Sequence, residues 1–213
     1  SDSHTESAVI TTMKPTDGNS SITYNNVKNI EYQGTQAQGG TFVYNNVENI
    51  RKEAVELKNS YSSKNSSLGM GLSAGIGSKG SIKSNGISGN VSQSNGNLNT
   101  EGTNYQNGNF VNVNEVHNNT GSMTLTGFNQ EGGKVTGNIE KLVVESKQNT
   151  SITTGSSRNV GVGFSGNGIP NSLNVIQNNT NGTKNYVENQ SSFTVGQGSN
   201  LQVGTLENTG AVI

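Results

Sequence analysis

The stretch Ile22-Thr23-Tyr24-Asn25-Asn26-Val27-Lys28-Asn29-Ile30 returns in the next part of the chain, without a gap, as Phe42-Val43-Tyr44-Asn45-Asn46-Val47-Glu48-Asn49-Ile50. In both copies apolar and polar residues alternate before an Asn-Asn pair, which indicates a strand with one buried face. Because Asn accepts left-handed backbone conformations, we expect corners at Asn25-Asn26 and Asn45-Asn46. A short repeat that buries little by itself is typical of a solenoid, in which each coil stacks on its neighbours.

A second duplication, with a much longer shift, overlies the first. It aligns Ile30-Glu31-Tyr32-Gln33-Gly34 with Met123-Thr124-Leu125-Thr126-Gly127, and Gly39-Gly40-Thr41-Phe42 with Gly132-Gly133-Lys134-Val135. Two copies therefore cover most of the chain, and each short unit reads as strand, turn, strand.

These repeats predict an all-β chain that forms a parallel β-helix with coils of roughly 20 residues, a period typical of solenoids. We expect residues 1–17 to be a poorly ordered leading segment and residues 18–213 to be a single β-helix of two duplicated halves, about 18–115 and 116–213. At the strand spacing of ~4.8 Å this length would give roughly ten coils and a rod of about 50 Å. We expect the Gly/Ser/Asn-rich residues 69–102 and 155–183 to be flexible excursions from the rod. The alternative is that residues 68–76 and 160–164, in which apolar residues alternate with Gly, form a small extra hairpin.

One segment of the first half is also compatible with a helix. Val47, Ile50, Ala54 and Leu57 have helical spacing, with charged residues on the other side. The duplicate Ile139-Glu140-Lys141-Leu142-Val143-Val144-Glu145 is richer in β-branched residues and favours a strand, which is the prediction that we adopt.

The composition excludes several kinds of partner. The chain is 28% hydrophobic, with 29 Gly, no Trp and no Cys, and its formal net charge is −1. A thick globular core is hard to build from these residues, whereas a solenoid needs few large apolar residues per coil. There is no basic excess for nucleic acid, no cysteine for disulfides or thiolate metal sites, and no apolar run near the ~20 residues of a membrane-spanning helix.

A glycan-active enzyme is the main alternative, because β-helices can carry acidic groups and cations on one outer face. Here the only aspartates are Asp2 and Asp17, both in the leading segment. Glu48 and Glu140 occupy matching repeat positions and are interpreted as solvent-exposed residues on the outside of the coils, not as a catalytic pair. We therefore predict no enzyme and no catalytic residue.

The two histidines give no metal site. His4 lies in the leading segment and His117 in the expected turn Val116-His117-Asn118-Asn119, and the sequence shows no further ligands near either. No phosphate loop or nucleophile elbow is present. We predict no cofactor-binding residues, no metal ligands and no cofactor; recognition would depend on a polar face of stacked Asn, Ser and Thr, and on contact loops at 95–104 and 178–184.

The order of these motifs resembles the haemagglutinin repeats of the filamentous haemagglutinin family, the exoproteins of two-partner secretion that include contact-dependent growth-inhibition proteins. The resemblance rests on the following segments: Met123-Thr124-Leu125-Thr126-Gly127, Gly133-Lys134-Val135-Thr136, Leu142-Val143-Val144-Glu145-Ser146, Val160-Gly161-Val162-Gly163, Tyr186, Glu188-Asn189-Gln190-Ser191-Ser192-Phe193 and Gly210-Ala211-Val212-Ile213.

This resemblance implies a right-handed β-helix within a longer secreted protein of the bacterial cell surface or outer membrane. It also implies export through an outer-membrane partner transporter and a role in adhesion, toxin delivery or virulence. The expected partner is a receptor or glycan on a host or neighbouring cell. Stable membrane insertion is not expected, although the strands that alternate with glycine are a possible membrane contact.

Overall fold

The computed structural model describes residues 1–15, 19–76, 82–166 and 169–213, and it contains strands but no helix in this part of the chain. The chain divides into two compact units. The coil unit comprises residues 5–58, 103–150 and 185–213, and the hairpin unit comprises residues 1–4, 59–102 and 151–184. The all-β class predicted from the repeats is confirmed and is consistent with a β-helix repeat family.

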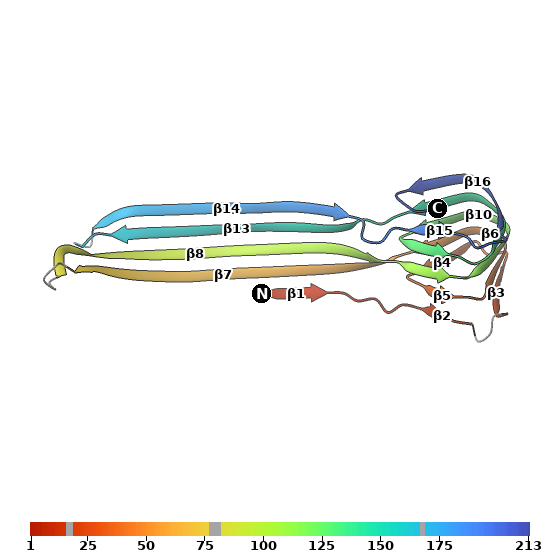
Figure 1. Cartoon of the computed structure of the whole chain (residues 1–213), viewed down its shortest axis with the longest axis horizontal. Helices are drawn as coiled ribbons and strands as arrows, with labels where there is room; N and C mark the ends of the chain where they lie inside the picture. Colours follow the sequence, from red (N-terminus) through yellow and green to blue (C-terminus); the bar gives the residue numbers. More distant parts are fainter. Residues whose placement is uncertain (16–18, 77–81, 167–168) are drawn as a thin grey trace. The chain divides into compact units, whose positions relative to one another are not determined.

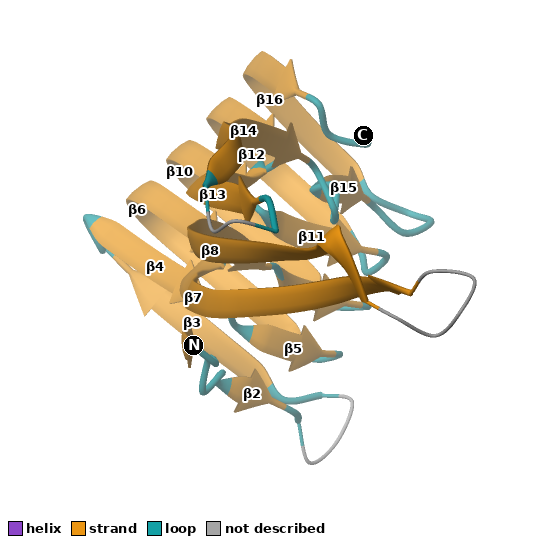
Figure 2. Cartoon of the chain, turned by 90° about the vertical axis from the view of Figure 1, so that its left-hand side faces the viewer, coloured by secondary structure: helices purple, strands orange, loops and turns teal. Residues whose placement is uncertain are grey.

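The coil unit is built from two sheets through which the chain passes alternately (Figure 2). The first sheet has the order β15-β11-β9-β5-β2, with bounds Ser192–Thr194, Phe128–Glu131, Gly108–Val111, Gln36–Gln38 and Thr12–Met13. The second has the order β16-β12-β10-β6-β3, with bounds Asn200–Thr209, Val135–Glu145, Asn114–Thr126, Thr41–Glu53 and Ser21–Asn25, and β4 (Asn29–Gln33) also pairs with β6.

Neighbouring strands of these two sheets pair in parallel, and their register reproduces the sequence repeats. Ile22 pairs with Phe42 and Ile30 with Ile50, an offset of 20 residues that the asparagine pairs of the same strands share. Ile50 in turn pairs with Met123, which places Ile30 and Met123 in one column, as the longer duplication requires. The duplications found in the sequence are therefore the strand register of the sheets.

Alternation sends one side chain in two to the interior of the coil unit. The buried column that starts at Ile30 continues through Ile50, Met123 and Leu142. Parallel columns of apolar side chains complete a narrow core, the largest members of which are Tyr44, Phe110, Phe128, Leu125 and Ile139. A small number of large apolar residues is sufficient because each one contacts its equivalents in the coils on both sides.

The corners lie where asparagine and glycine were expected to form them. Asn26 and Asn46 have φ of 53° and 52°, so both adopt left-handed backbone. Gly34 and its duplicate Gly127 have φ of 57° and 63°. Residues without a large Cβ penalty in this region are therefore placed at equivalent corners of successive coils.

The hairpin unit is a single antiparallel sheet made of most of four long strands, β7 (Val55–Ile76), β8 (Ile82–Gln106), β13 (Asn149–Phe164) and β14 (Pro170–Tyr186), with β1 (Asp2–Thr5) at its edge. The ends of these strands at residues 55–58, 103–106, 149–150 and 185–186 belong to the coil unit. Figure 1 shows these strands side by side with alternating directions. Side-chain contacts fix their register: Ser62 lies beside Asn99, and Thr100 beside Thr153.

Three predictions need correction. The first sheet of the coil unit has five strands, so the described chain has about five coils and not ten, because the two Gly/Ser/Asn-rich segments form the long hairpins. These hairpins are far larger than the small one proposed as an alternative to flexible segments. In the leading segment, residues 2–5 and 12–13 are strands, and residues 16–18 lie outside the described residues.

The helix considered for residues 47–57 is absent. Residues 41–53 form β6, and β7 begins at Val55. Parallel neighbours on both sides provide hydrogen bonds along the whole of β6, so the sheet overrides the helical spacing of its apolar residues.

Candidate functional site

Ladders of side-chain amides cover the outside of the coil unit. Asn118 Nδ2 donates to Asn45 Oδ1 at 2.8 Å, and Asn45 Nδ2 donates to Asn25 Oδ1 at 2.7 Å. Asn119 is bonded in the same way to Asn46, at 3.0 Å. These amides satisfy one another along the stack, so they stabilise the register and still present a polar surface.

One face of the hairpin unit is apolar. In an antiparallel sheet, opposed residues share a face, and the pairs Ser62–Asn99 and Thr100–Thr153 set the register of the first three strands. Gly163 lies opposite Ser172, because a Cβ added to Gly163 would meet the Ser172 side chain. This pair sets the register of the fourth strand. Counted from these pairs, one side carries the apolar face, made of Leu68, Met70, Leu72, Val91, Val160, Val162, Phe164, Leu173 and Val175.

Several side chains of the apolar face are strongly exposed, whereas Val160, Val162 and Phe164 are half-buried. Met70, Leu72 and Leu173 have 79%, 87% and 71% of their surface accessible. Four residues of this face, Met70, Leu72, Val91 and Phe164, line a depression of about 550 Å³. Contiguous exposed apolar residues on a soluble protein are a feature of interaction surfaces.

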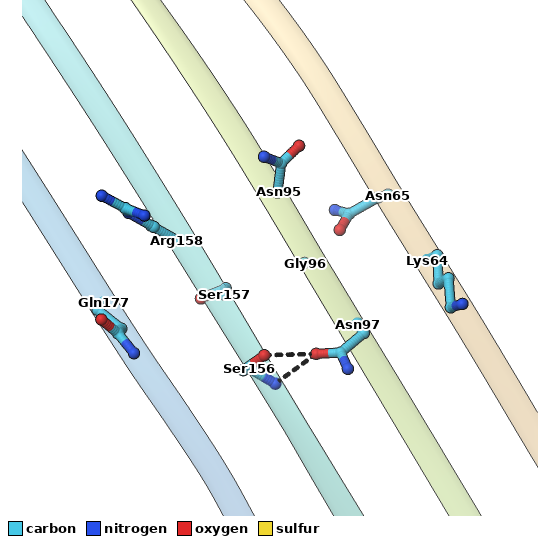
Figure 3. Close-up of a pocket in the computed structure, with 9 residues that line it drawn as sticks. All are labelled: Lys64, Asn65, Asn95, Gly96, Asn97, Ser156, Ser157, Arg158 and Gln177. Atoms are coloured by element: carbon cyan, nitrogen blue, oxygen red, sulfur yellow. Dashed lines mark hydrogen bonds between the residues drawn. The ribbon is translucent and has the colours of Figure 1, made fainter.

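A polar groove of about 450 Å³ crosses the same four strands (Figure 3). Its floor includes Gly96, and the Ser156 hydroxyl donates to Asn97 Oδ1 at 2.6 Å. Lys64 and Arg158 bring one cation each from β7 and β13, and the other lining residues are Asn65, Asn95, Ser157 and Gln177. Amides, hydroxyls and two cations suit an oxygen-rich or acidic ligand.

A second polar cluster lies inside the coil unit. Lys52 Nζ is 2.5 Å from Glu115 Oε1 and donates to Gln130 Oε1 at 2.9 Å. All three side chains are completely buried. Lys52 Nζ also lies 4.4 Å from the centre of the Phe110 ring and 5.9 Å from that of Phe128, so the cation is packed between aromatic faces.

Hydrogen bonds extend from Glu115 to both sides of the cluster. The Tyr44 hydroxyl donates to Glu115 Oε1 at 3.4 Å, and His117 Nε2 lies 3.4 Å from Glu115 Oε2. Tyr44 stacks on His117, with ring centroids 4.9 Å apart, and its hydroxyl lies 3.2 Å from that of Tyr32. The carboxylate is therefore held by several partners inside a nearly closed core.

Burial and charge alter the pKa values of this cluster. Burial raises the pKa of Tyr32 and of Tyr44 far above the usual value. Burial lowers the pKa of Lys52 more than the neighbouring Glu115 restores it. Burial would raise the pKa of Glu115, but the Lys52 charge and the contact with His117 lower it to about 2. Lys52 and Glu115 therefore form an ion pair, in which the Lys52 ammonium loses its proton more readily than a lysine in water does.

Of the residues considered in the sequence, His117 belongs to the buried cluster around Glu115, whereas Glu48, Glu140 and His4 lie outside both that cluster and the polar groove. Glu48 and Glu140 are exposed and lie on the two sides of Gly121. His117 is in β10 and buried, not in an open turn, although the turn itself is present because Asn119 has φ of 70°. His4 lies in β1. The described residues contain no group of three side chains able to hold a metal.

The two predicted contact loops are not loops. Residues 95–104 lie within β8 and residues 178–184 within β14, each paired with a neighbouring strand. Residues 95–97 nevertheless line the polar groove. The expected recognition segment was therefore placed near the groove but with the wrong local structure.

Sequence reasoning missed the cluster of Lys52, Glu115 and Gln130. Its signal lies in the repeat register: Lys52 pairs with Tyr32 and Leu125, and Glu115 with Phe42 and Val135. Two opposite charges thus occupy columns that are otherwise apolar. An alignment of the coils would have identified them as a buried pair.

Comparison with known proteins identifies the family. No curated protein and no solved structure matches the chain. None of the described residues form a helix long and apolar enough to cross a bilayer. The family model described as hemagglutinin repeat matches residues 1–162, about three quarters of the chain. With its repeats, its parallel register and this match, the chain belongs to the hemagglutinin repeat family of the filamentous haemagglutinin type.

Proposed function

We propose that this chain is a structural and presentation segment of a large secreted bacterial surface exoprotein, and that its hairpin unit makes the adhesive contact. The apolar face carries the proposal, because strands this exposed and this apolar are maintained at a cost in solubility. The polar groove beside Lys64 and Arg158 adds hydrogen-bonding groups for glycans or acidic surface molecules.

The coil unit is the scaffold in this proposal. Its coils wind as a right-handed parallel β-helix, the hand favoured for crossover connections between parallel strands. Both hairpins leave this scaffold at one register position, because Glu53 and Glu145 both pair with Thr126. The family resemblance supports export through an outer-membrane partner transporter and display at the cell surface, for an adhesin or for a toxin carrier.

Adhesion by beads coated with the purified chain tests the proposal. Beads at matched density are applied to cultured epithelial cells, to bacteria and to a glycan array, with albumin-coated beads as the baseline. We expect several-fold more attachment for the chain than for albumin. The triple variant Leu68→Ser, Met70→Ser, Leu72→Ser should lose attachment that depends on the apolar face, and Arg158→Gln should lose attachment that depends on the groove.

Three results would contradict this function. Attachment no greater than that of albumin on every surface would remove the adhesive role. Depolymerisation of a polysaccharide panel, abolished by Glu140→Gln or Glu145→Gln, would establish the glycan-active enzyme instead. Leakage from dye-loaded liposomes would show that the apolar face enters membranes and does not bind a surface receptor.

A further inference from the structure

The cluster of Lys52, Glu115 and Gln130 has the components of a self-forming covalent cross-link. We propose that Lys52 Nζ attacks the side-chain amide of Gln130 and forms an intramolecular isopeptide bond, with Glu115 transferring the protons. This modification would occur inside the folded coil unit, without a cofactor or a second protein, and is independent of any surface that the chain binds.

The nucleophile and its target are already in contact. Lys52 Nζ lies 2.9 Å from Gln130 Oε1. The carbonyl carbon is one C=O bond, ~1.2 Å, from that oxygen, so it is no farther than about 4.1 Å from the nitrogen. A small rotation of either side chain brings the pair to the ~3–3.5 Å of a near-attack conformation. Three elements hold them there, since Lys52 lies in β6, Glu115 in β10 and Gln130 in β11.

The leaving group is marked by a missing hydrogen bond. Gln130 Nε2 is buried and has no hydrogen-bond partner in the described part of the chain. A buried amide nitrogen without an acceptor is unfavourable, and Asn129 Oδ1 is the one other buried side-chain atom of the described residues without a partner. Loss of this nitrogen as ammonia would remove the unsatisfied group.

The protons balance without an external acid or base. The Lys52 ammonium first gives one proton to the Glu115 carboxylate, across the 2.5 Å contact. The neutral amine then forms the new C–N bond to Gln130 Cδ, and the C=O π electrons move to oxygen. As the carbonyl re-forms, the bond from Cδ to Nε2 breaks. Nε2 takes the Glu115 proton, Glu115 takes the extra proton from Nζ, and ammonia leaves.

The surroundings favour each step. Packing between Phe110 and Phe128 favours the uncharged amine, in agreement with the lowered pKa of Lys52. Burial raises the pKa of Glu115, and the Lys52 charge is the first of the influences that lower it. After the reaction that charge is gone, so Glu115 remains as a carboxylic acid that can donate to the new amide. Tyr44 and His117 keep its position fixed.

The bond would close a loop between residues 52 and 130 that contains β7, β8, β9 and β10. A pull along the chain would then pass from Lys52 to Gln130 directly. The hairpin formed by β7 and β8 would carry no load, and the coils on both sides could not separate even if their hydrogen bonds opened. Such protection is useful to a surface protein whose contact is under tension.

Intact mass spectrometry of the denatured chain tests the inference. We expect a mass about 17 Da below the sequence mass, which corresponds to one ammonia lost per chain in the amine attack. Trypsin does not cleave after an acylated lysine, so digestion should release residues 52–58 joined to residues 84–134 as one branched peptide. Lys52→Arg and Gln130→Met should have their full sequence masses, and Glu115→Gln should lose little or no ammonia.

The matched control is Lys58→Arg. Lys58 is exposed and ion-paired with Glu56, so this variant changes a lysine outside the core and should keep the loss of about 17 Da. Circular dichroism of every variant shows whether it folds, and the wild-type mass alone is decisive if a variant does not.

Three results would overturn the inference. The first is a folded wild-type chain with its full sequence mass after prolonged incubation. The second is a loss of about 17 Da that maps to an Asn-Gly succinimide, which mild base hydrolyses to Asp or isoAsp with a mass about 1 Da above the sequence mass. The third is a link from Lys52 to Glu115 with loss of water. Binding of the coated beads to cells plays no part in this test, so the two proposals fail independently.

Discussion

Lys52 Nζ lies 2.5 Å from Glu115 Oε1, although 63 residues separate the two and neither side chain has accessible surface. A buried ion pair of this kind specifies a register more than it adds stability, because both charges lose their hydration. The loss of stability caused by a substitution in this pair therefore depends on whether the opposite charge remains buried without a partner.

Removal of one charge of the Lys52–Glu115 pair should destabilise the fold more than removal of both charges. In a Gln130→Met background, where no amide is available to Lys52, we expect Glu115→Leu to lower the free energy of unfolding by about 3–5 kcal/mol. The double variant Lys52→Met, Glu115→Leu should recover most of this loss. Urea denaturation followed by circular dichroism measures both, and equal losses in the single and double variants would contradict the prediction.

Acid should destabilise the coil unit through Glu115. Burial would raise its pKa, but Lys52 and His117 lower the folded value to about 2, compared with 4.5 for an ordinary glutamate. The contribution is present above pH 4.5 and is lost as the pH falls from 4.5 toward 2, at most about 3 kcal/mol. In the Gln130→Met background the urea midpoint should fall across this range, and with Glu115→Gln added the profile should be flatter. Parallel profiles would refute the assignment to Glu115.

Substitutions of Asn46 can distinguish the stability that comes from its left-handed backbone from the stability that comes from the amide ladder. Its φ is 52°, and its amide accepts from Asn119 and donates to Asn26. Asn46→Gly removes the amide but keeps the left-handed conformation, whereas Asn46→Ala also strains the backbone by roughly 1–2 kcal/mol. We expect the alanine variant to unfold at a lower urea concentration than the glycine variant. Equal midpoints would mean that the ladder, and not the corner, determines the residue.

Gly137 should tolerate no side chain. Its φ is 104°, and a Cβ at this position would collide with the backbone carbonyl of His117 in the adjacent strand. We expect Gly137→Ala to cost at least about 3 kcal/mol or to prevent folding. Gly182→Ala is the control, because a Cβ added there would meet no heavy atom within 4 Å. Similar thermal midpoints for both variants would show that the coil relaxes around position 137.

The repeats predicted the coil unit well because sequence identity and strand register express the same constraint. Ile22 and Phe42 occupy one column, so they are apolar for one reason, and the Asn26 and Asn46 corners follow from their left-handed backbone. Nothing comparable identifies the hairpin unit. Its strands pair through backbone groups and have little buried surface. Apolar alternation is therefore confined to short runs such as Leu68, Met70 and Leu72, and it does not predict that the 22 residues from Val55 to Ile76 form one strand.

The polar core cluster was hidden by the insertion of the first hairpin. Asn25 and Asn45, in successive coils, are 20 residues apart, whereas Asn45 and its equivalent Asn118 in the next coil are 73 residues apart. The difference arises because the chain between β6 and β10 leaves the coil unit. Lys52 and Glu115 therefore have no obvious relation in a reading of the linear sequence. Their complementarity becomes visible only when the coils are superimposed through the register of both sheets.

The shared register of Glu53, Thr126 and Glu145 has a consequence for how such a chain can diversify. A long insertion follows Glu53 and another follows Glu145, while the coil between them turns directly at Gly127. Closing a longer loop costs only about 0.6 kcal/mol for each doubling of its length. One corner of the coil can thus be lengthened, shortened or exchanged in successive turns, and new recognition elements can be grafted there while the spine of the molecule stays the same.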